Sequence, residues 1–321
     1  MTRATPTMTE FETGVVVAGV DDIADDVVLL TLVPGDGGHL PAWTPGAHLD
    51  LILDGGVVRQ YSLCGSPADR DRYQVAVLRA PDSRGGSEAV HRLAEADRIT
   101  IRGPRNHFPL VASPRYVFVA GGIGITPIIP MIEEADAAGA DWVLHYGGRT
   151  TQSMAFRDPL AKYGERVHQV PQDQSGLLDI PALLGEPAPE VLVYCCGPEP
   201  LLRAVEEQCR DWPSGSLHLE RFTAKERIEE TADTAFEVVL QRSGLTLRVE
   251  PEVSVFDTMR AAGVSVLGSC LEGICGTCEQ AVLEGEVDHR DSVLDEDEQA
   301  AHDCMMVCVS RARGPRLVLD A

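Results

Sequence analysis

The sequence has 321 residues, 44% hydrophobic and 24% charged, which is enough chain for two or three domains with their own cores. Its 50 acidic and 27 basic residues give a formal net charge of −23. This balance argues against nucleic acid or an anionic membrane as partner, because both need clustered Lys and Arg. An acidic surface suits a basic protein partner, or it simply keeps the protein soluble.

The cellular location of the protein is predicted from three features: membrane spans, a signal peptide and the number of cysteines. No stretch approaches the roughly 20 apolar residues of a membrane span, and the start, MTRATPTMTEFETG, does not resemble a signal peptide. We therefore expect a soluble, cytoplasmic protein, and a monomer. Nine cysteines in a reducing compartment favour metal binding over a disulfide framework.

From about residue 12 to 112, short apolar runs such as VVLLTLV, LDLILDGG and YQVAVLRA alternate with turn residues. This rhythm predicts an antiparallel β-barrel or sandwich, interrupted by one helical stretch, SEAVHRLAEAD. At one strand end, RQYSLCG offers a cation for phosphate, an aromatic face and a hydroxyl in Arg59, Tyr61 and Ser62.

A second candidate anion site in this segment is SRGGSEAV, where Gly85, Gly86 and Ser87 open the helical stretch. Backbone N–H groups and a hydroxyl at a helix start suit a phosphate. The alternative is that Ser87 only caps the helix.

From about residue 115 to 222 strands alternate with helices, which predicts parallel βαβ units. In YVFVAGGIGITPI a strand runs into a glycine-rich turn and then a helix. The residues concerned are Gly121, Gly122, Gly124, Thr126 and Pro127. A helix start after a strand suits a pyrophosphate, although such a turn is also explained as merely tight.

A second strand end, VLVYCCGPEPLL, brings Cys196, Gly197 and Pro198 before another helix. Ligands of open parallel sheets bind at the carboxyl ends of strands, so the two turns are expected to line one crevice. Cysteines elsewhere in the segments so far are interpreted as small buried hydrophobic residues, namely Cys64, Cys195 and Cys209.

Residues 223–234, TAKERIEETADT, are polar and charged without an apolar period, and we interpret them as an interdomain linker. After it, FEVVLQRSGLTLRVEP predicts a hairpin and VSVFDTMRAAG a short helix ended by Gly263.

The next stretch, GSCLEGICGTCEQ, has the spacing Cys270-x4-Cys275-x2-Cys278, and with Cys308 further on it matches plant-type 2Fe-2S ferredoxins. Glycines between the cysteines let a short loop wrap a cluster closely. Cys304 competes for the fourth position, but Cys308 is preferred because it lies in the apolar run MMVCV. A structural zinc site is the alternative, which the x4 spacing fits poorly.

RQYS, RGGS, GGIGITP, YCCGP, LERF and C-x4-C-x2-C in this order resemble the phthalate dioxygenase reductase family, which includes reductases of vanillate-type O-demethylases. The resemblance covers nearly the whole chain, and the order is its most specific feature, because related reductases carry their ferredoxin domain at the N-terminus. It implies a flavin-binding antiparallel β-barrel at 1–112 and a parallel-sheet NAD-binding α/β domain at 113–222. A C-terminal β-grasp plant-type ferredoxin domain follows the linker, at 235–321.

The resemblance also implies roles for single residues. FMN, rather than FAD, would bind through RQYS, the backbone of VLRA, RGGS and the aromatic residue of LERF: Arg59, Gln60, Tyr61, Ser62, Val77, Arg79, Gly85, Gly86, Ser87 and Phe222. The nicotinamide cofactor would bind through the two strand-end turns: Gly121, Gly122, Gly124, Thr126, Pro127, Cys196, Gly197 and Pro198. Ser62, Thr126 and Cys196 would then be the catalytic residues at the point of hydride transfer.

One further strand end bears on the choice between NADH and NADPH. The strand end HYGGRTTQSMAF offers Arg149 and two threonines but no acidic residue for a ribose 2′-OH. A lone Arg can accompany either cofactor, and we expect NADH, with NADPH possible.

A nicotinamide gives up two electrons as hydride and a 2Fe-2S cluster takes one, so a flavin must stand between them. We expect an NADH-dependent reductase that passes electrons to a separate Rieske-type oxygenase, because the sequence has no C-x-H Rieske pattern and no room for a haem domain. A haem-thiolate monooxygenase as acceptor and a non-catalytic redox-sensing protein are the alternatives. No hydrolytic catalytic set is needed, and His107 and His289 are interpreted as structural.

Overall fold

The computed structural model describes residues 11–80, 85–224, 233–294 and 296–321. It divides into two compact units, one of residues 10–220 and one formed mainly by residues 221–321. No helix in the described part of the chain has the length and apolar character needed to cross a membrane.

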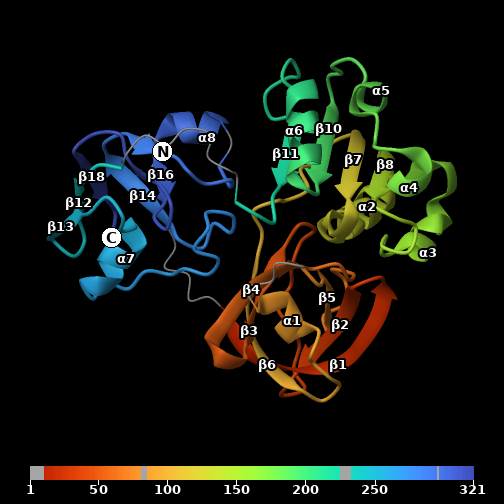
Figure 1. Ribbon diagram of the computed structural model, residues 1–321, viewed down its shortest axis with the longest axis horizontal. Coiled ribbons are helices and arrows are strands. Elements are labelled where there is room, and N and C mark those ends of the chain that lie inside the picture. The colour runs from red at the N-terminus through yellow and green to blue at the C-terminus, as the bar shows by residue number, and fades with distance from the viewer. Residues whose placement is uncertain (1–10, 81–84, 225–232, 295) are drawn as a thin grey trace. The chain divides into compact units, whose positions relative to one another are not determined.

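The first half of the larger unit is an antiparallel barrel (Figure 1), with strand order β4-β3-β6-β1-β2-β5. A bridge between Leu63 and Val75 links the two outer strands and closes it. Alternation builds its core, as in β3, where Leu49 and Leu51 are fully buried on the inner face. The strands are β1 (Glu12–Ala24), β2 (Val27–Pro34), β3 (His48–Leu53), β4 (Val57–Ser62), β5 (Tyr73–Leu78) and β6 (Arg98–Arg105), with η1 (Asp54–Gly56) and α1 (Gly86–Val90) between them.

The second half is a five-stranded parallel sheet of order β11-β10-β7-β8-β9. Side chains of α2 belong to one core and those of α5 and α6 to another, so the sheet is covered on both faces. The strands are β7 (Arg115–Gly121), β8 (Asp141–Gly148), β9 (Val167–Pro171), β10 (Val191–Cys196) and β11 (Leu217–Glu220). The helices are η2 (Gly122–Gly124), α2 (Ile125–Ala137), α3 (Arg157–Leu160), η3 (Ala161–Arg166), α4 (Gln172–Ser175), α5 (Ile180–Leu184) and α6 (Glu199–Gln208).

The smaller unit is a mixed sheet of order β13-β12-β18-β14-β16 with α7 packed into its core, a β-grasp arrangement. The predicted hairpin is confirmed as β12 and β13, and the helix before Gly263 as α7. Its elements are β12 (Phe236–Leu240), β13 (Leu245–Val249), α7 (Val255–Ala261), β14 (Glu279–Glu284), β15 (Val287–Asp288), α8 (Glu296–Ala301), β16 (Cys304–Met306), β17 (Arg311–Ala312) and β18 (Arg316–Leu319).

The predicted architecture of barrel, parallel α/β sheet and β-grasp domain is therefore confirmed. Most of the proposed linker, 225–232, lies outside the described residues. The helix predicted over SEAVHRLAEAD is wrong in extent, because α1 ends at Val90. Beyond it the chain turns, with Ala96 at φ +72° and the Asp97 carboxylate accepting from the Ala94 N–H.

Candidate functional site

The two glycine-rich turns at the carboxyl end of the parallel sheet pack directly against each other. A Cβ on Gly124 would lie 2.3 Å from the Cys196 carbonyl oxygen, and one on Gly121 would lie 2.6 Å from Cδ of Pro198. Gly197 in turn lies against Gly121, with 3.0 Å from its Cβ position to the Gly121 backbone. These three glycines are therefore required by the contact between the turns, which brings the predicted nucleotide residues together as one edge.

Gly122 differs from its neighbours, because its φ is +54° and nothing lies within 4 Å of its Cβ position. Its open side is where a ligand can approach the backbone. Thr126, by contrast, is buried and its hydroxyl donates to the Ile123 carbonyl at 3.0 Å. Thr126 and the adjacent Pro127 thus stabilise the turn from inside, and their contact with a cofactor stays a prediction.

Three polar groups meet where strand β4 of the barrel ends beside β10 and β11 of the sheet. Cys196 and Glu220 are register partners on the two parallel strands. Oε2 of Glu220 accepts from the Ser62 hydroxyl at 3.5 Å and from the Cys196 thiol at 3.9 Å. Ser62 and Cys196, two of the predicted catalytic residues, are thus joined by a carboxyl group that sequence reasoning missed.

Protons are held in this cluster at neutral pH. Glu220 keeps part of its residue surface exposed, but burial of the carboxyl group raises its pKa to about 8, against the hydrogen bonds from Ser62 and Cys196. Burial, and then the charge of Glu220, raise the pKa of Cys196 well above its ordinary value. Ser62, Glu220 and Cys196 therefore form a connected set of groups that carry exchangeable protons.

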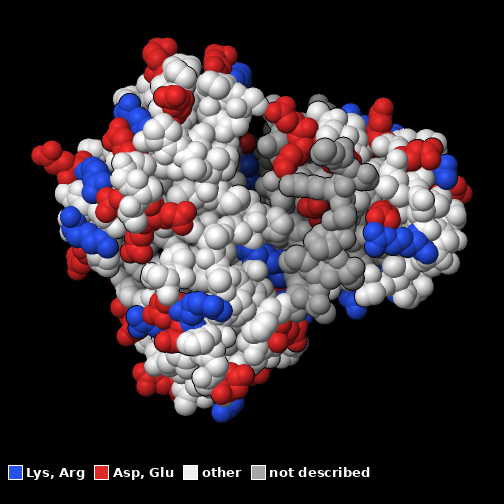
Figure 2. Space-filling model, turned by 180° about the vertical axis from the view of Figure 1, so that it is seen from behind, with Lys and Arg blue, Asp and Glu red and all other residues white. Residues whose placement is uncertain are grey.

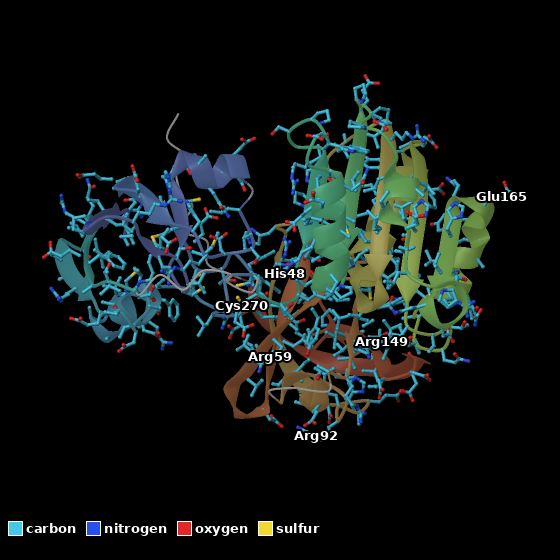
Figure 3. All side chains as sticks on the ribbon, turned by 45° about the horizontal axis from the view of Figure 1, so that its top comes forward. His48, Arg59, Arg92, Arg149, Glu165 and Cys270 are labelled. Atoms are coloured by element: carbon cyan, nitrogen blue, oxygen red, sulfur yellow. The ribbon has the colours of Figure 1, made fainter. Side chains whose placement is uncertain are left out.

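The predicted flavin-phosphate residues lie together at the start of α1. Gly85 has φ +85° and open space at its Cβ position, while a Cβ on Gly86 would lie 2.4 Å from Cγ of Arg59. Gly86 therefore lets the Arg59 side chain cross the turn, which places a cation beside the helix start (Figure 3). Ser87 lies inside the helix and its hydroxyl accepts from the Ala80 N–H at 3.1 Å, so the interpretation as an N-cap is wrong.

The rest of the predicted flavin set is distributed along β4 and β5. Tyr61 packs partly buried against the barrel core, and burial raises its pKa to about 12. Beside it, Gln60 has its Nε2 buried without a hydrogen-bond partner among the described residues. On β5, the Val77 carbonyl already contacts Nε2 of His91 at 3.0 Å.

His91 is a second residue that sequence reasoning missed. Its other ring nitrogen, Nδ1, lies 3.1 Å from the Arg79 guanidinium, so the ring links the Arg79 side chain to the Val77 carbonyl. The N–H of Arg79 donates to the Asp26 carbonyl, so that group is not available to a ligand. Phe222 belongs to the smaller unit and is 38% exposed, and its contact with a flavin stays a prediction.

Arg149 lies exposed in the loop after β8 (Figure 3), where the sequence offered no acidic neighbour. The fold supplies one, because β8 and β9 are adjacent and Gly148 pairs with Pro171. The N–H of Asp173 donates to the Arg149 carbonyl at 3.1 Å, so its exposed carboxylate belongs to the same edge of the sheet. Asp173 is the third functional candidate that sequence reasoning missed.

In the smaller unit the four predicted cysteines form two adjacent sulfur pairs. The Cys278 thiol donates to Sγ of Cys308 at 3.0 Å, and Cys270 and Cys275 hydrogen-bond each other. This bonding lowers the pKa of Cys275 to about 5 and also lowers that of Cys308, which yields thiolates, the form that binds iron. All nine cysteines are free of disulfides, as expected.

The backbone of the cysteine loop also fits a cluster. Gly273 and Gly276 have positive φ, and a Cβ on Gly273 would lie 2.6 Å from Cγ2 of Val309. N–H groups of the loop point at sulfur: Glu272 donates to Cys270 at 3.3 Å and Gly273 donates to Cys308. Hydrogen bonding and burial raise the pKa of Cys270 and Cys278, so these two thiols would lose their protons on binding iron. Four cysteine sulfurs with backbone donors around them are the donor set of a 2Fe-2S centre.

Cys304 stands apart from this set, on β16 opposite Ala281 of β14. Burial and the carboxylates of Glu279, Asp303 and Glu298 raise the pKa of its thiol to about 12. The geometry therefore favours Cys308 over Cys304 as the fourth ligand.

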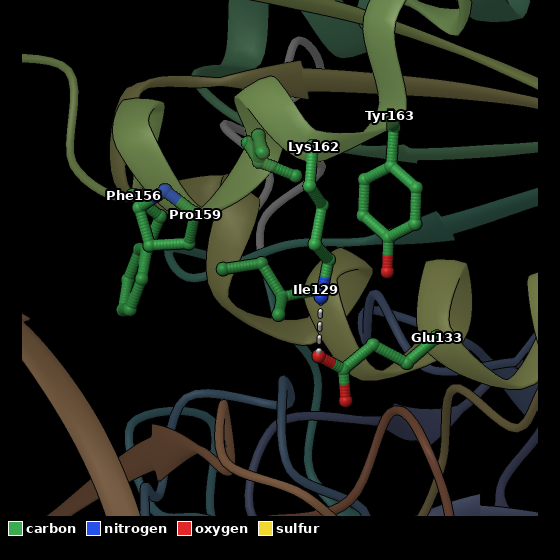
Figure 4. Close-up of a pocket in the computed structure, with 7 residues that line it drawn as sticks. Ile129, Glu133, Phe156, Pro159, Lys162 and Tyr163 are labelled. Atoms are coloured by element: carbon green, nitrogen blue, oxygen red, sulfur yellow. Dashed lines mark ion pairs between the residues drawn. The ribbon is translucent and has the colours of Figure 1, made fainter.

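A small pocket between α2 and the segment of α3 and η3 lies apart from these groups (Figure 4). Its volume of about 20 Å³ is room for about one water molecule, and an ion pair of 3.6 Å between Lys162 and Glu133 closes one side. It is far too small for a flavin or a dinucleotide.

Comparison with known proteins agrees with this geometry. Residues 238–313 match the family model of the 2Fe-2S iron-sulfur cluster binding domain. The chain is 43% identical over 301 residues to the phenoxybenzoate dioxygenase subunit beta of Ectopseudomonas oleovorans, covering 92% of this chain and 93% of the relative.

Two solved structures share the fold of nearly the whole chain. Phthalate dioxygenase reductase is 35% identical with a TM-score of 0.70, covering 98% of each chain. An intact type IV self-sufficient cytochrome P450 monooxygenase is 47% identical with a TM-score of 0.91, covering 97% of this chain, which spans only 41% of that longer one. With this identity over almost its full length, the chain belongs to the phthalate dioxygenase reductase family of oxygenase reductase subunits.

Proposed function

We propose that this protein is a cytoplasmic, monomeric, NADH-dependent reductase that passes electrons through FMN and a 2Fe-2S cluster to a separate oxygenase. The observation that carries the proposal is the meeting of Ser62, Cys196 and Glu220 at the junction of barrel and parallel sheet, in a chain that also holds the four-cysteine set. The proposed domains are 1–112 for FMN, 113–222 for NADH and 235–321 for the cluster, with the linker between.

FMN would be held by the barrel. Arg59 and the turn of Gly85 and Gly86 place a cation and backbone donors at the start of α1, where a phosphate binds well. Tyr61 offers an aromatic face, and the buried Nε2 of Gln60 needs an acceptor that a flavin ring oxygen can supply. Arg59 and the glycine turn thus suit a monophosphate, and Tyr61 and Gln60 suit a polar aromatic ring.

NADH would bind along the strand ends of the parallel sheet. The interlocked turns fix the backbone that faces the pyrophosphate, with Gly122 as the point of closest approach. Asp173 would accept from the hydroxyls of the adenosine ribose and disfavour a 2′-phosphate, which favours NADH over NADPH. Arg149 would lie at the same end of the cofactor.

The bound cofactors supply hydride transfer and one-electron transfer, and the protein supplies position and protons. Ser62 presents its hydroxyl at the junction and is held there by Glu220. Glu220, protonated at neutral pH, can pass its proton to the Ser62 hydroxyl while that hydroxyl gives its own proton onward, so that the carboxyl group ends as a carboxylate. Cys196 donates to the same carboxyl oxygen and keeps it oriented.

The central test is a spectrum of the purified protein with and without NADH. The expected result is flavin absorption with a broad cluster spectrum, release of FMN on denaturation, and bleaching by NADH followed by reduction of ferricyanide or cytochrome c. A colourless protein that contains zinc would contradict the proposal. A protein with a cluster but no turnover of NADH would instead support the redox-sensing alternative.

The ligand set has its own test. Cys308→Ser is expected to lose the cluster, with at least a tenfold drop in cluster-dependent cytochrome c reduction, because a hydroxyl binds iron far less well than a thiolate. Cys304→Ser is the matched control, expected to keep iron and sulfide at the wild-type level. A normal cluster in the Cys308→Ser protein would refute the assignment.

A second candidate acceptor is a haem-thiolate monooxygenase instead of a Rieske-type oxygenase. The observation that favours it is the 47% identity to the self-sufficient P450, in which a chain of this fold is part of a monooxygenase. The two are separated by mixing the NADH-reduced protein with each acceptor type. Faster electron transfer to a Rieske-type oxygenase supports the first proposal, and faster reduction of a P450 haem supports the second.

A further inference from the structure

Asp291 is a buried carboxylate in the smaller unit, and the function proposed above gives it no role. Its side chain has 0% exposure. It follows β15 in the stretch VDHRD, whose His289 the sequence suggested to be structural. A buried charge is expensive unless it is bound and oriented, so its partners show what it holds in place.

Three hydrogen-bond donors hold this carboxylate. Oδ2 accepts from the N–H groups of Val293 at 3.2 Å and Leu294 at 2.9 Å, and Oδ1 accepts from the Ser310 hydroxyl at 3.3 Å. The first two bonds close the turn after Asp291. The third reaches the segment that follows Cys308 by two residues.

The turn that Asp291 closes supports the cysteine loop directly. The N–H of Ser292 donates to the Gly273 carbonyl at 2.8 Å. On its other side Gly273 donates its own N–H to Sγ of Cys308. A Cβ on Gly273 would lie only 3.1 Å from Cα of Asp291, so the loop rests on this residue.

The two residues before Asp291 are both basic, and their partners differ. The ring of His289 lies 3.6 Å from Oδ1 and its side chain is 3% exposed. Burial lowers the pKa of His289, so at neutral pH this ring does not supply a compensating positive charge. The guanidinium of the next residue, Arg290, is bound by the carboxylates of Asp233 and Asp288.

We propose that Asp291 is a positioning residue of the iron-sulfur centre that also lowers its reduction potential. It closes the turn from which Ser292 orients the Gly273 peptide toward Cys308, and its buried charge disfavours the extra electron of the reduced cluster. The charge effect is strong at this depth because little solvent screens it. This inference rests on the proposed cluster.

The test is an anaerobic redox titration of the full-length protein, with the reduced cluster measured by its EPR signal. Asp291→Asn keeps the shape and one acceptor oxygen but removes the charge. At a given potential the ratio of reduced to oxidised cluster is expected to rise about tenfold, a midpoint shift of about 59 mV for one electron. Asp257→Asn, which removes an exposed carboxylate of α7, is the control and is expected to change the ratio less than twofold.

Two further variants separate the charge from the fold of the loop. Asp291→Glu restores the charge and is expected to return the midpoint toward the wild-type value. Ser310→Ala keeps the charge but removes a donor to it, so the reduced fraction is expected to fall, opposite in sign to Asp291→Asn. This variant decides the case if Asp291→Asn does not hold a cluster.

The outcomes are distinct. The inference is overturned if, at a given potential, the ratio of reduced to oxidised cluster in both Asp291→Asn and Ser310→Ala stays within twofold of the wild-type ratio. It is also overturned if Asp291→Glu has the same midpoint potential as Asp291→Asn. Absence of a cluster in the wild-type protein overturns the proposed function instead.

Discussion

Glu220 makes the stability of the larger unit depend on pH. Burial raises the pKa of its carboxyl from the ordinary 4.5 to about 8, so the folded protein keeps a proton that the unfolded chain releases. Stability from this group is present below pH 4.5 and is lost as the pH rises through 8.

We therefore expect wild-type protein to lose about 2 kcal/mol of unfolding free energy between pH 5 and 9 relative to Glu220→Gln, a value reduced for partial exposure. The measurement is urea unfolding at both pH values, followed by flavin fluorescence. Glu186→Gln, at an exposed position, is the control and should follow the wild type. Equal pH dependence in wild type and Glu220→Gln would contradict the assignment.

Asp173 is expected to set the choice of nucleotide. In Asp173→Ser the repulsion of a 2′-phosphate is removed, so the ratio of kcat/KM for NADPH to that for NADH should rise about tenfold or more, equivalent to about 1.4 kcal/mol. Steady-state ferricyanide reduction with each nucleotide measures it. Asp158→Ser, at an exposed position of α3, should leave the ratio unchanged, and an unchanged ratio in Asp173→Ser would exclude this role.

At this scale the sequence is most informative where the signal is local. The spacing of Cys270, Cys275 and Cys278 is set by one loop, so it can be read without a structure. Glu220 stands in the LERF motif, but its link to Cys196 cannot be read from the sequence, because it exists only through the pairing of β10 and β11. Asp173 reaches Arg149 in the same way, across two adjacent strands.

At the scale of elements, the contact between the turns after β7 and β10 is a fixed part of the nucleotide edge. Gly124→Ala would place a Cβ 2.3 Å from the Cys196 carbonyl and 2.7 Å from the Gly197 N. Because both neighbours are backbone atoms, we expect a loss of about 2 kcal/mol in unfolding free energy and a several-fold rise in KM for NADH.

The control for this change is Gly14→Ala, where nothing lies within 4 Å of the Cβ position. Thermal unfolding and NADH kinetics of both variants measure the effect. If Gly124→Ala unfolds and binds NADH like Gly14→Ala, the turns are not interlocked as described.

Element types were easier to predict than element lengths. Alternating runs identify the barrel strands because one face of each strand is buried. The helical pattern of SEAVHRLAEAD is equally regular, yet α1 ends after Val90, because Asp97 binds the Ala94 N–H and favours a turn instead. Such competition between side chain and backbone is invisible in apolar periodicity.

At the scale of the whole molecule the acidic charge has a kinetic consequence. Residues 235–321 hold 16 acidic and 7 basic residues, and carboxylates are spread over the face shown in Figure 2. Basic cytochrome c should therefore be reduced more slowly as ionic strength rises from ~10 to ~150 mM, by about tenfold. Stopped-flow mixing with the NADH-reduced protein measures the rate.

The matched control for this effect is an acceptor of opposite charge. Ferricyanide is an anion, so its reduction should become faster over the same range of salt as repulsion is screened. Two rates that respond to salt in the same direction, or not at all, would contradict electrostatic docking.

The sequence predicts the order of the barrel, the parallel-sheet segment and the cysteine-containing segment well. Each of these has its own periodicity and its own motif. The residues between the segments carry neither, so the boundaries at 112 and 222 stay predictions. The two compact units described here separate near residue 220.

The protonation state of Cys304 affects which cysteines can bind iron. Iron binds to thiolates, and Cys304, four residues before Cys308 and on β16, would compete as a ligand if it ionised. Burial, and then the carboxylates of Glu279, Asp303 and Glu298, raise its pKa to about 12, so it remains a thiol at neutral pH, whereas the pKa values of Cys275 and Cys308 are lowered. The carboxylates beside β16 thus help to keep this additional cysteine in its thiol form, which leaves Cys308 as the metal-binding thiolate of the segment.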